Sequence, residues 1–417
     1  MQTHDTIDAD RASKETAKTM AAGADDIGAS LPPNRTRGGS TVLPGVERRE
    51  GQKVLVPRDQ PRYEVNKVLG EGGMGVVELA RDADIGRKVA IKRLRSQAAA
   101  SPTSLARFVE EVRTVGGLDH PGIAPIHDVG LDADGSFFFV MKYIEGETLE
   151  DVIKGLQAGD AELHRRMGFD QRVGLVLSVL NALDYAHSAG LLHRDLKPAN
   201  VMIGRYGEVL LVDWGIARPI GGDPDPEPTE AVEETGDDDG RTRLVATRAG
   251  ALIGTPLYMS PEQARGVTAG LDARSDVFSL GMLMAELLAL RHPLEGKRGV
   301  VEICGALQTF EMPPVHTPFW DHPQQPPVPS EYRHFLKKAL ALDPNDRYQS
   351  AGEMLAALTR VRAGDFAAQC PATFVKRMQY GSLGFVDKHP LLSNFLLLFV
   401  ALSVLSSVGG ALLVLLR

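Results

Sequence analysis

The sequence predicts an α+β fold made of two subdomains, the first rich in strands and the second rich in helices. From Val65 to Leu94, short runs of Val, Leu and Ile are broken by glycines, a pattern typical of strands joined by hairpins. Beyond Leu105, apolar residues recur at helical spacing over most of the chain. The two ends differ from this core: the first fifty residues contain no Phe, Trp or Tyr, and residues 391–416 contain no charged side chain.

The individual elements follow from local patterns. Phe108, Val112, Val115 and Leu118 form one apolar stripe and predict a helix. Residues 137–143 form a continuous apolar run and predict a buried strand. Four further helical patterns cover residues 171–189, 276–290, 331–341 and 350–362.

The composition is that of an ordinary globular protein, with 43% hydrophobic and 24% charged residues. The two cysteines are too few for a disulfide framework or a four-thiolate metal site. The net charge of −8 comes from residues 223–239, which contain nine acidic residues and no Lys or Arg. Because the rest of the chain is close to neutral, we expect no nucleic-acid partner.

Four segments are expected along the chain. Residues 1–60 lack the apolar surface that would offset the entropy of ordering, and they are predicted to be a disordered arm without a secretory signal. Residues 61–361 form the folded domain, and residues 362–390 form a linker. Residues 391–416 would make a helix about 39 Å long, enough to cross a hydrocarbon core of about 30 Å. A buried core helix is the alternative for this last segment.

A glycine-rich segment begins at Gly70 and follows the pattern G-x-G-x-x-G-x-V as far as Val77. A dinucleotide-binding loop should open a helix and be followed by an acidic residue about 20 positions later, but a strand follows and position 95 is Arg. The Gly-Lys-Ser/Thr of a Walker loop is absent. A simple turn remains possible on this pattern alone. A glycine hairpin between strands can also lay its backbone N–H groups over phosphates.

Lys92 ends the apolar strand Val-Ala-Ile-Lys and has two alternative interpretations. A lone lysine at a strand end is ordinarily solvated. Glu111, however, falls on the buried stripe of the following helix, and a buried carboxylate needs a cation. We therefore expect Lys92 to pair with Glu111, with Glu110 as the partner if the helix phase differs.

The densest group of polar residues is His-Arg-Asp-Leu-Lys-Pro-Ala-Asn at 193–200, which predicts a rigid loop. An apolar strand and then Asp-Trp-Gly at 213–215 follow it. With these motifs, residues 63–361 resemble the bacterial eukaryotic-like (Hanks-type) serine/threonine protein kinases. The later motifs 254–262 and 275–281 and a late Arg347 extend the resemblance. The resemblance implies a bilobal protein kinase fold, with a small strand-rich N-lobe and a larger helical C-lobe.

The resemblance also implies a set of catalytic roles and two cofactors, ATP and Mg²⁺. Lys92 would hold the α- and β-phosphates and pair with Glu111. Asp195 would accept the proton of the substrate hydroxyl, and Lys197 would contact the transferring phosphate. Asn200 and Asp213 would hold Mg²⁺.

The implied ATP-binding residues come from both lobes. Adenine would lie between two small apolar side chains above it and Met202 below it, and residues 142–144 would form the hinge. The full implied set is Leu69, Gly70, Gly72, Gly75, Val77, Ala90, Lys92, Met141 as gatekeeper, and Met202.

Other family landmarks are structural. Glu262 and Arg347 match the buried ion pair of the family, and Asp276 matches the residue that anchors the catalytic loop, although it could be only a helix N-cap. Two positions depart from the family pattern: Trp214 replaces the usual Phe, and Ser260 replaces the usual Ala.

The activation segment, residues 213–262, is unusually long because it contains the acidic insert 223–239, which we expect to be disordered. Thr247 lies eight residues before Thr255, where family members carry a regulatory phosphate. We expect phosphorylation at Thr247, with Thr242 as the second candidate and an unmodified threonine as the alternative.

The resemblance implies a serine/threonine kinase that phosphorylates proteins, itself included, and residues 391–416 predict a single-pass anchor in the inner membrane. The basic balance of residues 362–390 places the kinase domain on the cytoplasmic side. Small residues spaced four apart in the anchor, such as Ser403 and Ser407, would let two copies form a homodimer, with a passive anchor as the alternative. A catalytically inactive kinase-like scaffold is the alternative function, and a small-molecule kinase is disfavoured by the peptide-substrate motif at 254–262.

Overall fold

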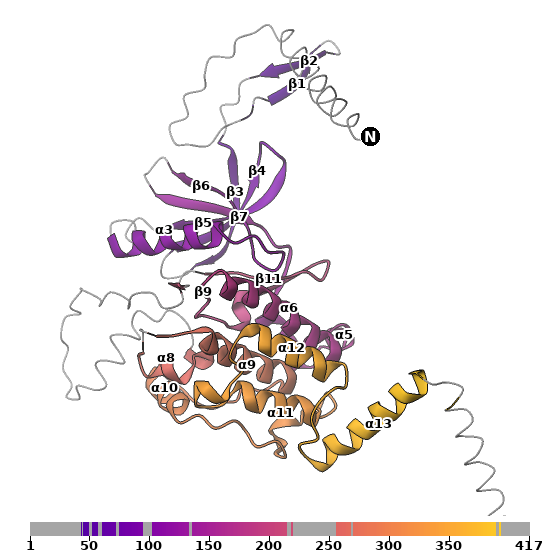
Figure 1. Ribbon diagram of the computed structural model, residues 1–417. Helices are drawn as coiled ribbons and strands as arrows, with labels where there is room; N and C mark the ends of the chain where they lie inside the picture. Colours follow the sequence, from indigo (N-terminus) through magenta and orange to yellow (C-terminus); the bar gives the residue numbers. More distant parts are fainter. Residues whose placement is uncertain are drawn as a thin grey trace, which may run out of the picture.

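The computed structural model describes residues 43, 45–49, 52–56, 61–71, 75–94, 102–132, 136–214, 218–219, 256–267, 270–388 and 392. Several predicted features lie outside these residues: Gly72, Thr242, Thr247, the acidic insert 223–239, and the apolar segment 391–416 apart from Leu392. The described chain forms two lobes, a sheet-based N-lobe stacked on a helical C-lobe (Figure 1). The two-subdomain α+β architecture predicted from the sequence is present.

The N-lobe is built on a five-stranded antiparallel sheet with the order β3-β4-β5-β7-β6. Helix α3, Pro102–Gly116, packs beside it and places Phe108 against Leu94 and Phe139. This packing buries Phe108 and partly buries Val112, whereas Val115 and Leu118 of the same apolar stripe pack in the main core cluster. The strands are β3 Tyr63–Glu71, β4 Gly75–Asp82, β5 Arg87–Leu94, β6 Ile126–Leu131 and β7 Phe137–Lys142.

Two short strands precede this sheet. They are β1, Gly45–Arg49, and β2, Gln52–Val56, which pair as an antiparallel hairpin. The hairpin lies within residues 1–60, where we expected an arm without ordered structure.

The C-lobe packs around α9, Ala273–Ala289, which is buried on nearly every face. A helix that is apolar all round must be covered on all sides, and α6, α11 and α12 surround this one. The other helices are α4 Leu149–Ala158, α5 Ala161–Arg166, α6 Phe169–Ser188, α8 Pro261–Ala264, α10 Val300–Gln308, α11 Ser330–Ala339 and α12 Ala351–Arg362. Short 3₁₀ turns are η1 Pro198–Asn200, η2 Pro256–Tyr258, η3 Pro318–Trp320 and η4 Pro344–Asp346.

Two small sheets flank the polar loop at residues 193–200. One has the order β11-β10-β8, formed by Val209–Leu211, Val201–Gly204 and Gly146–Thr148. The other pairs β9, Leu191–Leu192, with β12, Arg218–Pro219. The polar loop at residues 193–200 therefore connects β9 of one small sheet to β10 of the other, and both of its ends are fixed.

A last helix, α13, covers Pro371–Lys388 and extends from the C-lobe (Figure 1). It occupies most of the segment 362–390 that we expected to be a linker. None of the helices in the described part of the chain is both long enough and apolar enough to cross a bilayer.

Candidate active site

Lys92, at the lobe junction, is in contact with two carboxylates. Its Nζ lies 2.6 Å from Glu111 Oε1 on α3 and 3.1 Å from Asp213 Oδ1 after β11. Glu111 is buried, whereas Glu110 is exposed, so the helix phase is the one used to predict the pair. One cation thus connects the sheet, the helix and a loop that follows the C-lobe strands.

The charges of this group stabilise one another. Burial lowers the pKa of Lys92, but the carboxylates of Asp213 and Glu111 outweigh burial and raise it overall. Burial raises the pKa of Asp213, but Lys92 outweighs it, and the net pKa is lowered. The pKa of Glu111 is raised, chiefly by burial and against the pull of Lys92. Lys92 and Asp213 are therefore both charged at neutral pH, and an opposite charge at hydrogen-bond distance is the physical cause.

The carboxylate of Asp195 is held from two sides. Lys197 Nζ donates to its Oδ2 at 2.6 Å, and Asn200 Nδ2 donates to the same oxygen at 3.1 Å. Asn200 Nδ2 also donates to the backbone oxygen of Asp195 at 2.8 Å, which fixes the direction of the amide. The Asp195 side chain keeps 30% of its surface exposed, so the carboxylate is positioned by the loop yet open to a substrate.

Asn200 and Asp213 offer a donor set that suits Mg²⁺. The NH₂ group of Asn200 is engaged with Asp195, and no described hydrogen bond engages its amide oxygen. Asp213 pairs with Lys92 through Oδ1, and no described hydrogen bond engages its Oδ2. The described residues contain no cluster of three or more His, Cys, Asp or Glu side chains that would hold a metal alone. One amide and one carboxylate oxygen fit Mg²⁺, which usually keeps several waters and shares its coordination with substrate phosphates.

Asp276 anchors the polar loop to the central helix α9. Its carboxylate accepts hydrogen bonds from the backbone N–H groups of His193 and Arg194 and from His187 Nε2, each at 2.8 Å. Arg194 has a φ of 66°, a left-handed conformation that costs energy for a residue with a Cβ. Burial raises the pKa of Asp276, but the His187 hydrogen bond leads the opposing effects and the net pKa is lowered. The buried carboxylate thus holds a strained backbone segment next to Asp195.

Trp214, which replaces the usual Phe, packs into the C-lobe core. It is 2% exposed, and its ring centroid lies 4.6 Å from that of His193. The neighbouring Asp213 has a φ of 60°, so the chain turns sharply between the carboxylate and the indole. The larger ring is accommodated beneath the loop while Asp213 still reaches Lys92.

A second connection ties the loop to the segment after residue 256. Ser260 and Gln263 form a capping box at the start of α8. Gln263 Nε2 also donates to the backbone oxygen of Arg194 at 3.0 Å. Glu262 meets Arg347 through two hydrogen bonds of 2.8 and 2.9 Å. Sequence reasoning missed Gln263, although the Ser-x-x-Gln spacing of a capping box was there to be read.

The expected ATP-binding residues lie on both sides of the lobe junction. Ala90 on β5 is the cross-strand neighbour of Met141 on β7, and Val77 on β4 is opposite Lys92. Met202 on β10 packs against the cluster formed by Ala124, Ile144 and Leu210. Leu69 and Gly70 lie on the exposed part of β3, and Gly75 begins β4.

Gly75 has no room for a side chain. A Cβ built there would lie 2.2 Å from the backbone oxygen of Arg93. The close approach of β4 to β5 at this point therefore requires glycine, independently of any bound phosphate.

Comparison with known proteins agrees with this geometry. The sequence model described as "Protein kinase domain" matches residues 63–357. A probable serine/threonine-protein kinase of Streptomyces coelicolor is 38% identical over 296 residues, covering 70% of this chain and 39% of the relative. Serine/threonine-protein kinase PknD of Protochlamydia amoebophila is 35% identical over 307 residues, 72% of this chain and 30% of the relative.

Serine/threonine-protein kinase PknB of Mycobacterium tuberculosis is 35% identical over 316 residues, covering 73% of this chain and 43% of the relative. The chain thus spans less than half the length of these curated relatives, and the shared part is the bilobal domain. The family match covers well over half of the chain and contains both lobes and the loop between them. The chain belongs to the protein kinase family, and its relatives include bacterial serine/threonine kinases.

Proposed function

We propose that this protein transfers the γ-phosphate of ATP to Ser and Thr hydroxyls of proteins, with Mg²⁺ as the metal. One observation carries the proposal: Lys92, Glu111 and Asp213 form one connected group, while Asp195, Lys197 and Asn200 form a second. Phosphoryl transfer needs alignment and charge neutralisation more than covalent assistance. The two groups supply these from the two lobes.

Each group has a distinct task. Glu111 keeps the ammonium of Lys92 directed into the junction, where it would bind the α- and β-phosphates. Asp195 would orient the acceptor hydroxyl and take its proton as the oxygen attacks the γ-phosphate. Lys197, which already contacts Asp195, would neutralise charge on the transferring group. Asn200 and Asp213 would hold Mg²⁺, which supplies positive charge to the phosphate oxygens when bound.

The test is phosphorylation of a protein substrate by the purified chain with ATP and Mg²⁺. Asp195→Asn removes the proton acceptor, and Lys92→Met removes the phosphate contact, so each should nearly abolish turnover. Urea unfolding of each variant checks that the fold persists. Turnover at the wild-type rate in Asp195→Asn would refute the role of Asp195, and loss of turnover in both supports an active enzyme rather than an inactive scaffold.

The proposal includes attachment to the inner membrane through residues 391–416, with the kinase domain in the cytoplasm. The support is the uncharged length of this segment and the basic balance of the chain before it. Truncation after Asp387 should release the kinase from membranes in active form. Retention of the truncated protein in the membrane fraction after a high-salt wash would contradict the anchor.

Regulation by phosphorylation at Thr247, or at Thr242, is part of the same proposal. A phosphate there would add about −1.5 to −2 charge and could pair with Arg194, ordering the activation segment. Mass spectrometry of active protein should find phosphate between residues 241 and 255. Active protein without phosphate in that stretch would contradict the assignment.

Pairing of two anchors would raise the local concentration of the kinase and favour phosphorylation in trans. At equal low concentration the full-length protein should therefore autophosphorylate faster than the truncated one. Equal rates would show that the anchor is passive.

A further inference from the structure

Helix α13 has one face on the C-lobe and another in solvent. On the C-lobe side, Thr373 is 1% exposed, and Lys376 Nζ lies 3.0 and 2.9 Å from the two carboxylate oxygens of Glu331 on α11. On the other side, Phe374, Val375 and Met378 are 55%, 63% and 64% exposed.

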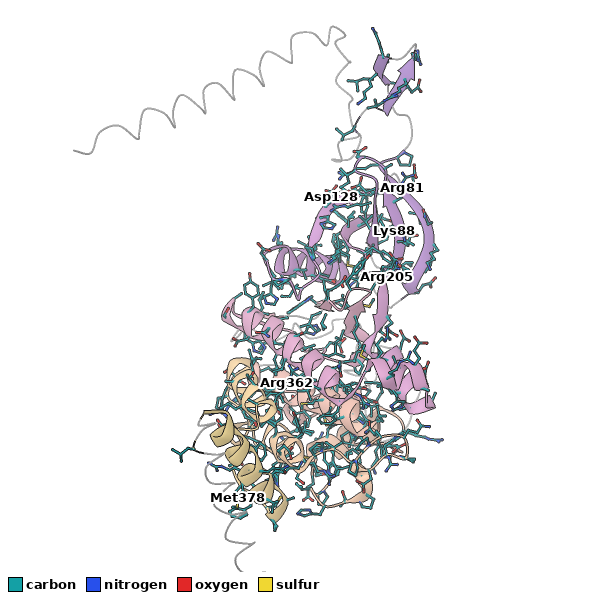
Figure 2. All side chains as sticks on the ribbon, turned by 90° about the vertical axis from the view of Figure 1, so that its right-hand side faces the viewer. Arg81, Lys88, Asp128, Arg205, Arg362 and Met378 are labelled. Atoms are coloured by element: carbon teal, nitrogen blue, oxygen red, sulfur yellow. The ribbon has the colours of Figure 1, made fainter. Side chains whose placement is uncertain are left out.

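The exposed residues share a single face. An α-helix turns about 100° per residue, so positions 374, 375 and 378 lie together within about 100° of arc. Thr373, which is buried, and Lys376, which pairs with Glu331, lie on the opposite side of the helix. A contiguous apolar patch on an exposed surface often marks an interaction site. Met378 and Arg362 both lie in the C-lobe, and Met378 is the farther of the two from Arg81 in the N-lobe sheet (Figure 2).

A cavity of about 410 Å³ opens at the base of the same helix, between α11, α12 and α13. Aromatic side chains, among them Phe335 and Tyr348, line it, together with Arg360 and Arg377. Both arginines are exposed, and no described carboxylate lies within ion-pair distance of either one.

The other charged groups of the cavity are largely compensated. Glu331 is neutralised by Lys376 at 2.9 Å, and Lys338 by Glu353 at 2.7 Å. Asp365 is the remaining acidic residue of the lining. Two arginines against one carboxylate leave the cavity with a net positive charge on the C-lobe side of α13. Around the helix, Arg377 lies between the buried Thr373 and Phe374 of the apolar face.

We propose that α13 lies on the membrane surface, with Phe374, Val375 and Met378 in the lipid interface and Arg360 and Arg377 at the phosphate groups of anionic lipids. The inference rests on the proposed anchor at 391–416. If that segment spans the bilayer, α13 ends at Lys388, only two residues earlier, and an extended connection of this length reaches about 11 Å. A surface with an apolar face and with arginines that no described carboxylate pairs, tethered at that distance, matches the interfacial region of an anionic bilayer in both charge and polarity.

Depth-dependent quenching tests the apolar face. The full-length chain, with Cys370→Ser, is labelled with the fluorophore NBD at Met378→Cys and reconstituted into vesicles that contain phosphatidylglycerol and nitroxide-labelled lipid. The matched control is labelled at Val301→Cys on α10, where Val301 is 56% exposed against 64% for Met378. The inference expects a blue-shifted, strongly quenched probe at 378 and an unquenched probe at 301. Equal, water-like emission at the two sites overturns it.

A charge series tests the arginines. Arg360→Gln and Arg377→Gln should each lower the ratio of docked to undocked α13 by about fivefold, because each basic residue near an anionic surface contributes that much. Arg362→Gln is the control, since Arg362 on the same helix as Arg360 is already paired with Asp170 at 2.7 Å. Equal ratios in phosphatidylcholine and phosphatidylglycerol vesicles, or equal effects of Arg362→Gln and Arg360→Gln, overturn the lipid-phosphate contact.

The outcomes separate this inference from the anchor. Protein that stays with the vesicles while the probe at 378 remains in water leaves the anchor intact and refutes the docking of α13. Protein that does not associate with vesicles refutes both. A blue shift that depends on protein concentration and not on lipid would show that a second copy of the chain covers the face, which also refutes the lipid contact.

Discussion

Replacing Asp276 by Asn should slow catalysis although this residue is not expected to contact ATP or substrate. One carboxylate oxygen accepts from both His193 N and His187 Nε2, and the other accepts from Arg194 N. An amide has only one oxygen. The least costly arrangement keeps that oxygen at the doubly used position and turns the NH₂ group toward Arg194 N, which then loses its acceptor.

The magnitude follows from two energies at Arg194. A hydrogen bond to a charged group contributes about 1.5–3 kcal/mol, and a left-handed residue with a Cβ costs about 1–2 kcal/mol. Once the bond is lost, the strain at Arg194 is less strongly opposed, so the peptide at Arg194 relaxes and Asp195 moves with it. A displacement of about 1 Å in a reacting group can cost about 100-fold in rate. We therefore expect kcat to fall about 100-fold, with KM for ATP nearly unchanged because Lys92 and Glu111 are not affected.

Steady-state phosphorylation of a peptide gives kcat and KM separately, and urea unfolding gives the loss of stability, which should be at least about 1.5 kcal/mol. Asp272→Asn is the matched control. Asp272 caps the same helix by accepting from Arg274 N at 2.9 Å, and Asn caps about as well as Asp. If Asp276→Asn retained kcat within twofold of the wild type, the link from the central helix to the catalytic carboxylate would be refuted.

Three further predictions concern other parts of the chain. Arg347→Ala should destabilise the protein by about 3–5 kcal/mol in urea because it leaves the largely buried carboxylate of Glu262 without its cation. Arg362→Ala, at an exposed pair, should cost less than about 1 kcal/mol, and equal losses would contradict this. Burial lowers the pKa of His292 to about 4, and its ring accepts from Leu294 N, so only the neutral form fits. The unfolded chain takes up the proton near pH 6.5 and the folded one only near pH 4, so this contribution is complete above pH 6.5 and falls by about 3 kcal/mol as the pH drops to 4. His292→Asn should flatten that part of the stability profile, and an unchanged profile would show that the imidazole does not titrate as described. Deleting residues 223–236 should leave basal peptide phosphorylation within a few-fold, and near-complete loss would show that the acidic insert takes part in catalysis.

The order of the elements could be predicted because it depends on local patterns. The stripe through Phe108 placed α3 and pointed Glu111 toward Lys92, and the structure has that contact at 2.6 Å. The helix patterns near 171–189 and 350–362 correspond to α6 and α12 within a few residues.

What escaped prediction depends on contacts between distant segments. Gln263 meets the backbone of Arg194 across 69 residues, and His187 meets Asp276 across 89. No local pattern encodes such a distance. The sequence predicts a linker where the structure has α13. The helix is held to the C-lobe by the contact of Lys376 with Glu331, a residue 45 positions earlier in the chain.

The ionic contact between Lys92 and Asp213 has a mechanical consequence. The loop that carries Asp195 and Asn200 is held to α9 by Asp276, whereas Lys92 is part of the N-lobe sheet. A rotation of one lobe would open this contact without moving Asp195, the proposed proton acceptor. A signal that only tilts the N-lobe would therefore separate Lys92 from Asp213 while the C-lobe loop that carries Asp195 and Asn200 keeps its conformation. Such a signal would stop the proposed phosphoryl transfer without any change within the C-lobe.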